Sequence, residues 1–172
     1  LLSEGCTGKL SMRILGIDPG LAATGFGAIE CGKPGPSVLK CGSIKTPAGE
    51  HISNRLFQIH TDITMLIRTL QPDLVAVENA FSLVRYPKAG IVLGGVLGII
   101  YLSVFQNNVS MIEITPKEIK NALVGYGNAD KQQVNTAIKK VLHVTTIRSM
   151  HASDALAAAL AAFYRKTPGR TR

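Results

Sequence analysis

Cysteine is scarce in this sequence of 172 residues, and its spacing excludes several kinds of site. The three cysteines are Cys6, Cys31 and Cys41, an odd number in which no two are separated by only two residues. The chain therefore has neither the pattern of a disulfide framework nor that of a cysteine zinc site. Scattered thiols of this kind are typical of the reducing cytoplasm, which is the compartment we predict.

A signal peptide is also missing. The first eleven residues have no long apolar core and no cleavage pattern. Met12 has the character of a natural start, so we interpret residues 1–11 as an expression remnant or a disordered extension. We expect a single domain over residues 12–166, followed by a short, basic and flexible tail over 167–172.

Long apolar runs are limited to one segment, residues 89–105, which is uncharged and just short of a membrane-spanning helix. Gly90, Gly94 and Gly98 repeat in it at four-residue spacing, which lets helices approach closely. Because no second such segment exists, we predict a buried helix in a soluble protein without membrane association. A helix that is apolar all round must be covered on all sides, so a dimer interface is a reasonable use for it, with Leu97 as a position expected to face the partner.

Acidic residues are few, with 11 Asp and Glu against 19 Lys and Arg, a net charge of +8. From Lys117 to the end of the chain there are ten basic residues and three acidic ones, a net charge of 10 − 3 = +7. Such a basic surface favours a polyanion, and both nucleic acid and an anionic membrane fit it. The composition otherwise excludes a disordered or fibrous chain.

Strand and helix patterns alternate along the chain and predict an α/β fold. Three strands open it as an antiparallel meander, at residues 13–17, 24–30 and 38–44. Later elements are expected as strands at 74–77 and 109–114 and as helices at 54–70, 89–105, from 116 onward, 131–142 and 151–165. The expected product is a five-stranded mixed sheet, part meander and part parallel, flanked by helices.

Three of the few acidic residues lie at positions that are typical of functional sites. Asp18 closes the first strand, and Glu78 closes the apolar strand 74–77. Asp154 follows His151 by three residues, which puts both side chains on one face of the last helix. The carboxyl ends of strands are where open sheets place their sites. Clustered carboxylates repel unless a cation neutralises them, and two Mg²⁺ ions held there would support phosphodiester hydrolysis.

Each of these residues also fits an ordinary structural role. Asp18 in Asp-Pro-Gly fits a turn former, and Glu78 fits a solvated residue at a strand end. His151 and Asp154 fit the N-terminal turn of a helix, where the macrodipole favours a carboxylate. Only their conjunction with the basic surface indicates a nuclease.

Four motifs in this chain resemble those of the RuvC family of Holliday junction resolvases, in the family order from Met12 to about Arg165. They are Ile14–Gly20 with Thr24–Gly27, Val77–Phe81, Val124–Lys131 and His151–Leu156. The resemblance implies an RNase H-like fold, a homodimer and a Mg²⁺-dependent endonuclease. Such enzymes cut two opposed strands of a four-way DNA junction symmetrically and leave 5′-phosphate and 3′-hydroxyl ends.

The resemblance also implies roles for particular residues. Carried over by position, the catalytic metal ligands are Asp18, Glu78, His151 and Asp154. Many members have Asp at the position of His151, so this departure bears on the metal preference, and Mn²⁺ is expected to work beside Mg²⁺. The remaining assignments place basic groups near the scissile phosphate, an aromatic group that stacks on junction bases and flanking phosphate contacts: Lys120 and Lys131, Phe81, and Arg85 with Lys88.

The sequence thus predicts a junction-resolving endonuclease of homologous recombination and DNA repair. The resemblance further implies partnership with the branch-migration proteins RuvA and RuvB, in a bacterial cytoplasm and near the nucleoid. Two alternatives stay open at this point. One is a non-catalytic nucleic-acid-binding module on the same fold, which would not need the intact acidic set. The other is an RNase H-like nuclease that acts on other branched DNA or RNA, because phosphate contacts carry little substrate identity.

Overall fold

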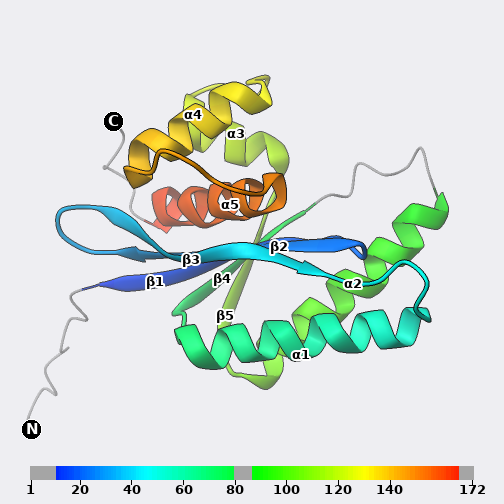
Figure 1. Ribbon diagram of the computed structural model, residues 1–172. Helices are drawn as coiled ribbons and strands as arrows, with labels where there is room; N and C mark the ends of the chain where they lie inside the picture. Colours follow the sequence, from blue (N-terminus) through cyan, green and yellow to red (C-terminus); the bar gives the residue numbers. More distant parts are fainter. Residues whose placement is uncertain (1–10, 80–86, 167–172) are drawn as a thin grey trace, which may run out of the picture.

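The computed structural model describes residues 11–79 and 87–166, and its centre is one five-stranded sheet (Figure 1). The sheet order is β3-β2-β1-β4-β5. Strands β1 (Met12–Asp18), β2 (Ala23–Cys31) and β3 (Pro36–Lys45) form the predicted antiparallel meander. Strands β4 (Leu74–Glu78) and β5 (Ser110–Ile114) continue the sheet in parallel with β1. The predicted mixed sheet is therefore confirmed.

Two layers of helices cover the two faces of this sheet (Figure 1). One layer holds α1 (Ile52–Leu70) and α2 (Pro87–Gln106). The other holds α3 (Pro116–Val124), α4 (Lys131–Leu142) and α5 (Met150–Lys166). Each layer packs on its own apolar core, because alternate residues of the buried strands point to opposite faces.

Local chemistry explains where the helices begin. The capping box predicted before α3 is present: the Thr115 side chain accepts a bond from the Glu118 backbone, and the Glu118 carboxylate accepts one from the Thr115 backbone. Helix α1 begins at Ile52, two residues earlier than predicted, because the His51 ring accepts a bond from the Ser53 backbone and acts as its cap. Capping by histidine leaves a weaker sequence signal than capping by Ser, Thr, Asp or Asn.

Three glycines bring α5 into direct contact with the sheet. A Cβ atom on Gly16 of β1 would lie 1.9 Å from the backbone oxygen of Ala155, and one on Gly25 of β2 would lie 2.1 Å from that of His151. A Cβ atom on Gly27 would likewise meet Leu156, at 2.7 Å. Because these positions lack side chains, the backbone of α5 rests on the backbones of β1 and β2. The helix that carries His151 and Asp154 is thereby placed at a fixed height above the strand ends.

Helix α2 is apolar on all sides, but only one side of it is covered. Val96, Leu97 and Ile100 are buried against the core that α1 shares. On the opposite side, Ile91 and Phe105 are 77% and 80% exposed. Within the single chain α1 and the sheet cover one face of the helix, so the expected cover of its other side by a dimer partner stays a prediction.

By length and composition, the same helix could cross a membrane over Lys88–Gln106, and 28% of this apolar stretch is buried.

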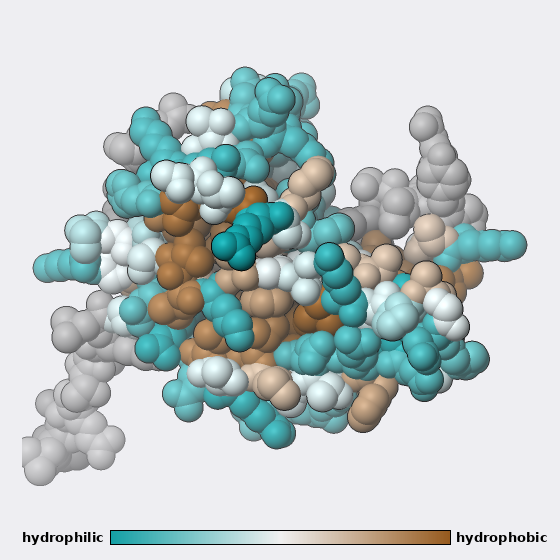
Figure 2. Space-filling view, viewed as in Figure 1, coloured by the Kyte–Doolittle hydropathy of each residue, from teal (hydrophilic) through white to brown (hydrophobic). Residues whose placement is uncertain are grey.

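Away from this helix, polar and apolar side chains occupy separate parts of the surface (Figure 2). Figure 2 shows hydrophilic side chains over the α3–α4 layer and over α1, with apolar side chains between them along the edge of the sheet. Leu39, on the edge strand β3, is one of the apolar side chains that the protomer leaves exposed.

Candidate active site

Two neighbouring parallel strands bring Asp18 and Glu78 to the same end of the sheet. Ile17 of β1 pairs with Val77 of β4, so the next residues, Asp18 and Glu78, lie side by side where these two strands end. The first turn of α5 adds His151 and Asp154 above this edge. The four residues predicted from the sequence to share one site therefore come from three elements, and the topology brings them together.

Short polar contacts order this cluster. His151 Nδ1 lies 2.8 Å from Asp18 Oδ2, in a hydrogen bond that joins α5 to the end of β1. Lys131 Nζ, at the start of α4, lies 3.5 Å from Asp154 Oδ2. Both acidic side chains are largely covered, whereas the Lys131 side chain is mostly exposed. Lys131 therefore reaches from solvent to the carboxylate cluster, and its role beside the scissile phosphate stays a prediction.

The carboxylates affect one another's ionisation. Burial, helped by the negative charges of Asp18 and Asp154, raises the pKa of Glu78 to about 7, against the opposing charge of Lys131. Burial also raises the pKa of Asp18, although its hydrogen bond to His151 works in the opposite direction. Two neighbouring carboxyl groups whose pKa values are raised in this way are a place where a cation is strongly favoured.

A cavity of about 240 Å³ opens beside this cluster. Its lining comes from β4, α3, α4 and α5: Glu78, Pro116, Ile119, Lys120, Lys131, Val134, Asn135, Met150, Ser153, Asp154 and Ala157. Lys120 and Lys131 thus share one cavity with two of the carboxylates. The arrangement presents positive charge to a phosphate on one side and carboxylates to a metal ion on the other.

The donor set suits hard divalent cations. Carboxylate oxygens are the ligands that Mg²⁺ prefers, and an imidazole beside them also suits Mn²⁺. Within residues 11–79 and 87–166, no three side chains of His, Cys, Asp or Glu are spaced to enclose an ion as they stand. In this arrangement Asp18 is engaged by His151, and Asp154 by Lys131. The identity of the ligands stays a prediction, which the chemistry of the donors supports.

The structure separates one predicted residue from the others. Lys88 is exposed near the start of α2 and is not among the residues that line the cavity. Figure 1 shows this end of α2 projecting beyond the sheet. Phe81 and Arg85 lie outside the described residues, so their predicted contacts with DNA stay predictions.

Sequence reasoning also missed residues that line the cavity. Asn135 lies one helical turn after Lys131, and its buried Oδ1 has no hydrogen-bond partner in the part of the chain that the structure describes. Ser153 directly precedes Asp154 and is buried in the wall of the cavity. The four-residue spacing from Lys131 was the available signal for Asn135.

Comparison with known proteins identifies the family to which the chain belongs. A family model described as crossover junction endodeoxyribonuclease RuvC matches residues 14–162. The chain belongs to the RuvC family. Relatives of the same description include one from Caldicellulosiruptor saccharolyticus, 40% identical over 152 residues, which are 87% of this chain and 90% of that relative. Another, from Synechococcus sp., is 37% identical over 90% of this chain and 100% of that relative.

Solved structures agree with the family. A RuvC structure from Thermus thermophilus matches with a TM-score of 0.83 and 31% identity, covering 90% of this chain and 96% of that one. The T. thermophilus RuvC in complex with Holliday junction substrate matches with a TM-score of 0.85 and 31% identity, over 90% and 95% of the two chains. The yeast mitochondrial Holliday junction resolvase Ydc2, at 12% identity and a TM-score of 0.63, shares the fold. The predicted RNase H-like fold class is therefore confirmed.

Proposed function

We propose that this RuvC family member is a metal-dependent endonuclease that resolves four-way DNA junctions. The observation that carries the proposal is the grouping of Glu78 and Asp154 at one cavity with Lys120 and Lys131, with Asp18 close enough for its charge to raise the pKa of Glu78. Family membership supports the reaction class, and the relative solved with a Holliday junction substrate supports the substrate. The reaction leaves 5′-phosphate and 3′-hydroxyl ends and needs no covalent intermediate with the enzyme.

The chain's own residues divide the work between metal binding and phosphate binding. Asp18, Glu78 and Asp154 would hold two divalent ions, with His151 as a further ligand or as a base acting through water. Such ions activate the attacking water and stabilise charge on the leaving 3′ oxygen. Lys120 and Lys131 hold the scissile phosphate beside these carboxylates and offset its negative charge. The rest of the basic surface binds the DNA backbone without regard to sequence.

The alternatives are a binding module and a nuclease with another branched substrate. The intact acidic set argues against a binding module, which has no use for the buried carboxyl groups of Asp18 and Glu78, whose pKa values are raised. A direct comparison separates all three: a synthetic four-way junction and a linear duplex are each incubated with the protein, with and without Mg²⁺. Symmetric nicking of the junction alone, and only with metal, is the expected result. Binding without cleavage in every metal tested would favour the module.

We further propose that the uncovered side of α2 is the interface of a homodimer. Ile91, Leu102 and Phe105 are exposed there, and Cβ atoms built on Gly94 and Gly98 meet nothing within 4 Å. These five residues lie on one helical face, because their spacings of three, four, four and three follow the helical repeat. A face of large apolar groups around two exposed glycines admits a second helix at close range. Two active sites related by a two-fold axis would match two opposed strands of a junction.

The dimer is tested by placing charge on this face. Leu97 was the position predicted to face the partner, but it is buried in the protomer core, so arginine there would disrupt folding instead. Leu102, 45% exposed, is the better site. Leu102→Arg is expected to give a folded monomer at micromolar concentration by analytical ultracentrifugation, because an unpaired charge would be buried in the interface. Leu39→Arg, at a position 39% exposed on β3, should leave the dimer intact. A monomeric unmodified protein would refute the interface.

The ion preference is tested at His151. An imidazole ligand is softer than a carboxylate and adds no negative charge, so Mn²⁺ should support cleavage at least as well as Mg²⁺. His151→Asp is expected to keep activity and to shift the preference towards Mg²⁺. His151→Ala should be strongly impaired, because it also removes the bond that holds Asp18. The measurement is single-turnover cleavage of a junction by each variant in each metal. Full activity of the alanine variant would leave His151 with a structural role only.

The cellular setting follows from the same family. We propose that the protein works in a bacterial cytoplasm, near the nucleoid, with the branch-migration proteins RuvA and RuvB. The net charge of +8 supports an association with DNA.

A further inference from the structure

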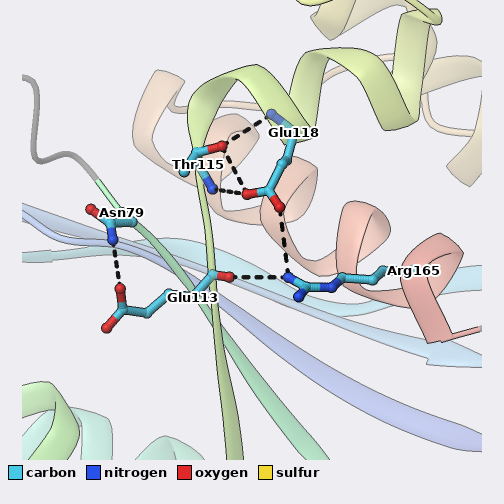
Figure 3. Close-up of polar contacts among 5 residues, drawn as sticks. All are labelled: Asn79, Glu113, Thr115, Glu118 and Arg165. Carbon is cyan, nitrogen blue, oxygen red and sulfur yellow. Dashed lines mark hydrogen bonds and ion pairs between the residues drawn. The ribbon is translucent and has the colours of Figure 1, made fainter.

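A second polar cluster lies behind the carboxylates, on the other face of the sheet (Figure 3). Glu113 of β5 accepts two hydrogen bonds through its two carboxylate oxygens. Asn79 Nδ2 donates to Oε2 at 2.5 Å, and the Tyr101 hydroxyl of α2 donates to Oε1 at 2.6 Å. One partly buried carboxylate thereby joins the end of β4 to helix α2.

The strand register shows that Glu113 and Glu78 face opposite ways. Val77 pairs with Glu113, and Glu78 pairs with Ile114. Ile114 belongs to the core beneath α3 and α5, whereas Val77 belongs to the core that α1 and α2 cover. Glu78 therefore points towards α5 and the active site, and Glu113 points towards α2. By the same alternation, the side chain of Asn79 returns to the face of Glu113.

Asn79 is the residue through which the two faces communicate. Its backbone N–H donates to the Ile114 carbonyl at 2.9 Å, and its side chain is held by Glu113. The residue after Glu78 is thus fixed at both its backbone and its side chain, just where β4 ends. Glu113 is itself held from a third side, because Arg165 Nη1 of α5 lies 3.5 Å from its carbonyl oxygen (Figure 3).

We propose that Glu113 is a positioning residue of the nuclease, which sets the place of the Glu78 carboxylate by holding Asn79 from the back of the sheet. The proposal deepens the proposed function and rests on it. The role is geometric: the charges that act on the pKa of Glu78 are those of Asp18, Asp154 and Lys131, and Glu113 is not among them. Partners that orient metal ligands in this way commonly change metal affinity or activity by about 10- to 100-fold when they are removed.

The decisive variant is Glu113→Ala, which leaves Asn79 and Tyr101 without their shared acceptor. Single-turnover junction cleavage should fall by roughly 10- to 100-fold, while the Kd for the junction measured in EDTA stays unchanged. The Mn²⁺ concentration that half-maximally raises the melting temperature should increase, which reports on the ligand site without any cleavage. Glu113→Gln should restore most of both properties, because an amide can accept from Asn79 and donate to the Tyr101 hydroxyl.

Two further variants separate positioning from general stability. Tyr101→Phe removes the other bond to Glu113 but keeps the bond to Asn79, so its cleavage rate should stay within about twofold of the unmodified protein. Asn79→Ala should reproduce the defect of Glu113→Ala, and the double variant should be no worse than either, since each removes the bond between Asn79 and Glu113.

The proposal is overturned if Glu113→Ala cleaves the junction at the normal rate, or if Glu113→Ala cleaves less only because it binds the junction with a higher Kd. It is also overturned if Tyr101→Phe lowers the cleavage rate as much as Glu113→Ala does. Additive defects in the double variant would overturn it as well. Failure of the unmodified protein to cut any junction would instead defeat the proposed function. In that event the Mn²⁺ titration of the melting temperature still decides whether Glu113 positions Glu78.

Discussion

Replacing Glu78 by glutamine is expected to abolish cleavage and also to make the metal-free protein more stable at pH 8. The loss of cleavage follows from the removal of a proposed metal ligand. Metal ions at such sites supply several kcal/mol of transition-state stabilisation, which corresponds to roughly a thousandfold in rate. Asp18→Asn and Asp154→Asn should abolish cleavage in the same way. All three should still bind the junction, because binding depends on the basic surface.

The gain in stability follows from the raised pKa of Glu78, about 7 in the folded protein against an ordinary value of 4.5. Below pH 4.5 the carboxyl is protonated in both states, so it adds no penalty. Between pH 4.5 and 7 the unfolded chain releases the proton and the folded protein keeps it, so stability falls as pH rises. Above pH 7 the penalty is complete, on the order of 3 kcal/mol. Glutamine carries no charge and escapes it.

Thermal melts in EDTA test whether the ionised Glu78 side chain lowers the stability of the folded protein. The melting temperature of Glu78→Gln should match that of the unmodified protein at pH 4 and exceed it by roughly 6–12 °C at pH 8. Mn²⁺ should raise the melting temperature of the unmodified protein at pH 8 far more than that of the variant. Asp62→Asn, on α1 at the other face of the sheet, is the matched control for exchanging a carboxylate for an amide. If Glu78→Gln were less stable at pH 8, the carboxylates would not be mutually destabilising.

Replacing Gly16 by alanine should have the largest effect on folding. The added Cβ would lie 1.9 Å from the Ala155 oxygen and 2.8 Å from the Ala159 nitrogen, and both are backbone atoms. No rotamer change relieves such contacts, so α5 must move away from β1. We expect a loss of about 3 kcal/mol, at the upper end of overpacking effects, or roughly 6–12 °C in melting temperature.

Gly25→Ala extends the same test to the active site. Its Cβ would press on the backbone of His151, so cleavage should fall by more than the lost stability explains. Gly49→Ala is the control, because a Cβ at Gly49 meets nothing within 4 Å. Melting curves and single-turnover rates of the three variants give the answer. If Gly16→Ala had the same melting temperature as Gly49→Ala, the contact between α5 and the sheet would be looser than it is in the structure.

Much of the site was predictable because it depends on strand order. Asp18 and Glu78 each follow an apolar strand, and strands that run parallel place their carboxyl ends at one edge. The spacing of His151 and Asp154 likewise settled their common face on a helix. The capping box at Thr115 marked the start of α3 for a similar reason, since its chemistry is local.

The rest depends on contacts that the sequence does not encode locally. The pairing of Glu113 with Asn79 requires the register of β5 against β4, and its pairing with Tyr101 requires the rotation of α2. Leu97 was misplaced because a helix that is apolar all round has no periodicity to distinguish its faces. The role of Gly16 was equally hidden, since a glycine in a strand does not reveal which helix approaches it.

The hydrogen bond between Asp18 and His151 joins residues 133 positions apart in the chain, which has a consequence for biosynthesis. Translation delivers Asp18 and Glu78 long before the helix that completes their site. Until α5 emerges from the ribosome and docks on Gly16 and Gly25, the nascent chain has a sheet with one face open and no assembled nuclease. Long-range contacts of this kind form late and slow folding. The site that Asp18, Glu78, His151 and Asp154 form is therefore complete only after α5 has been synthesised.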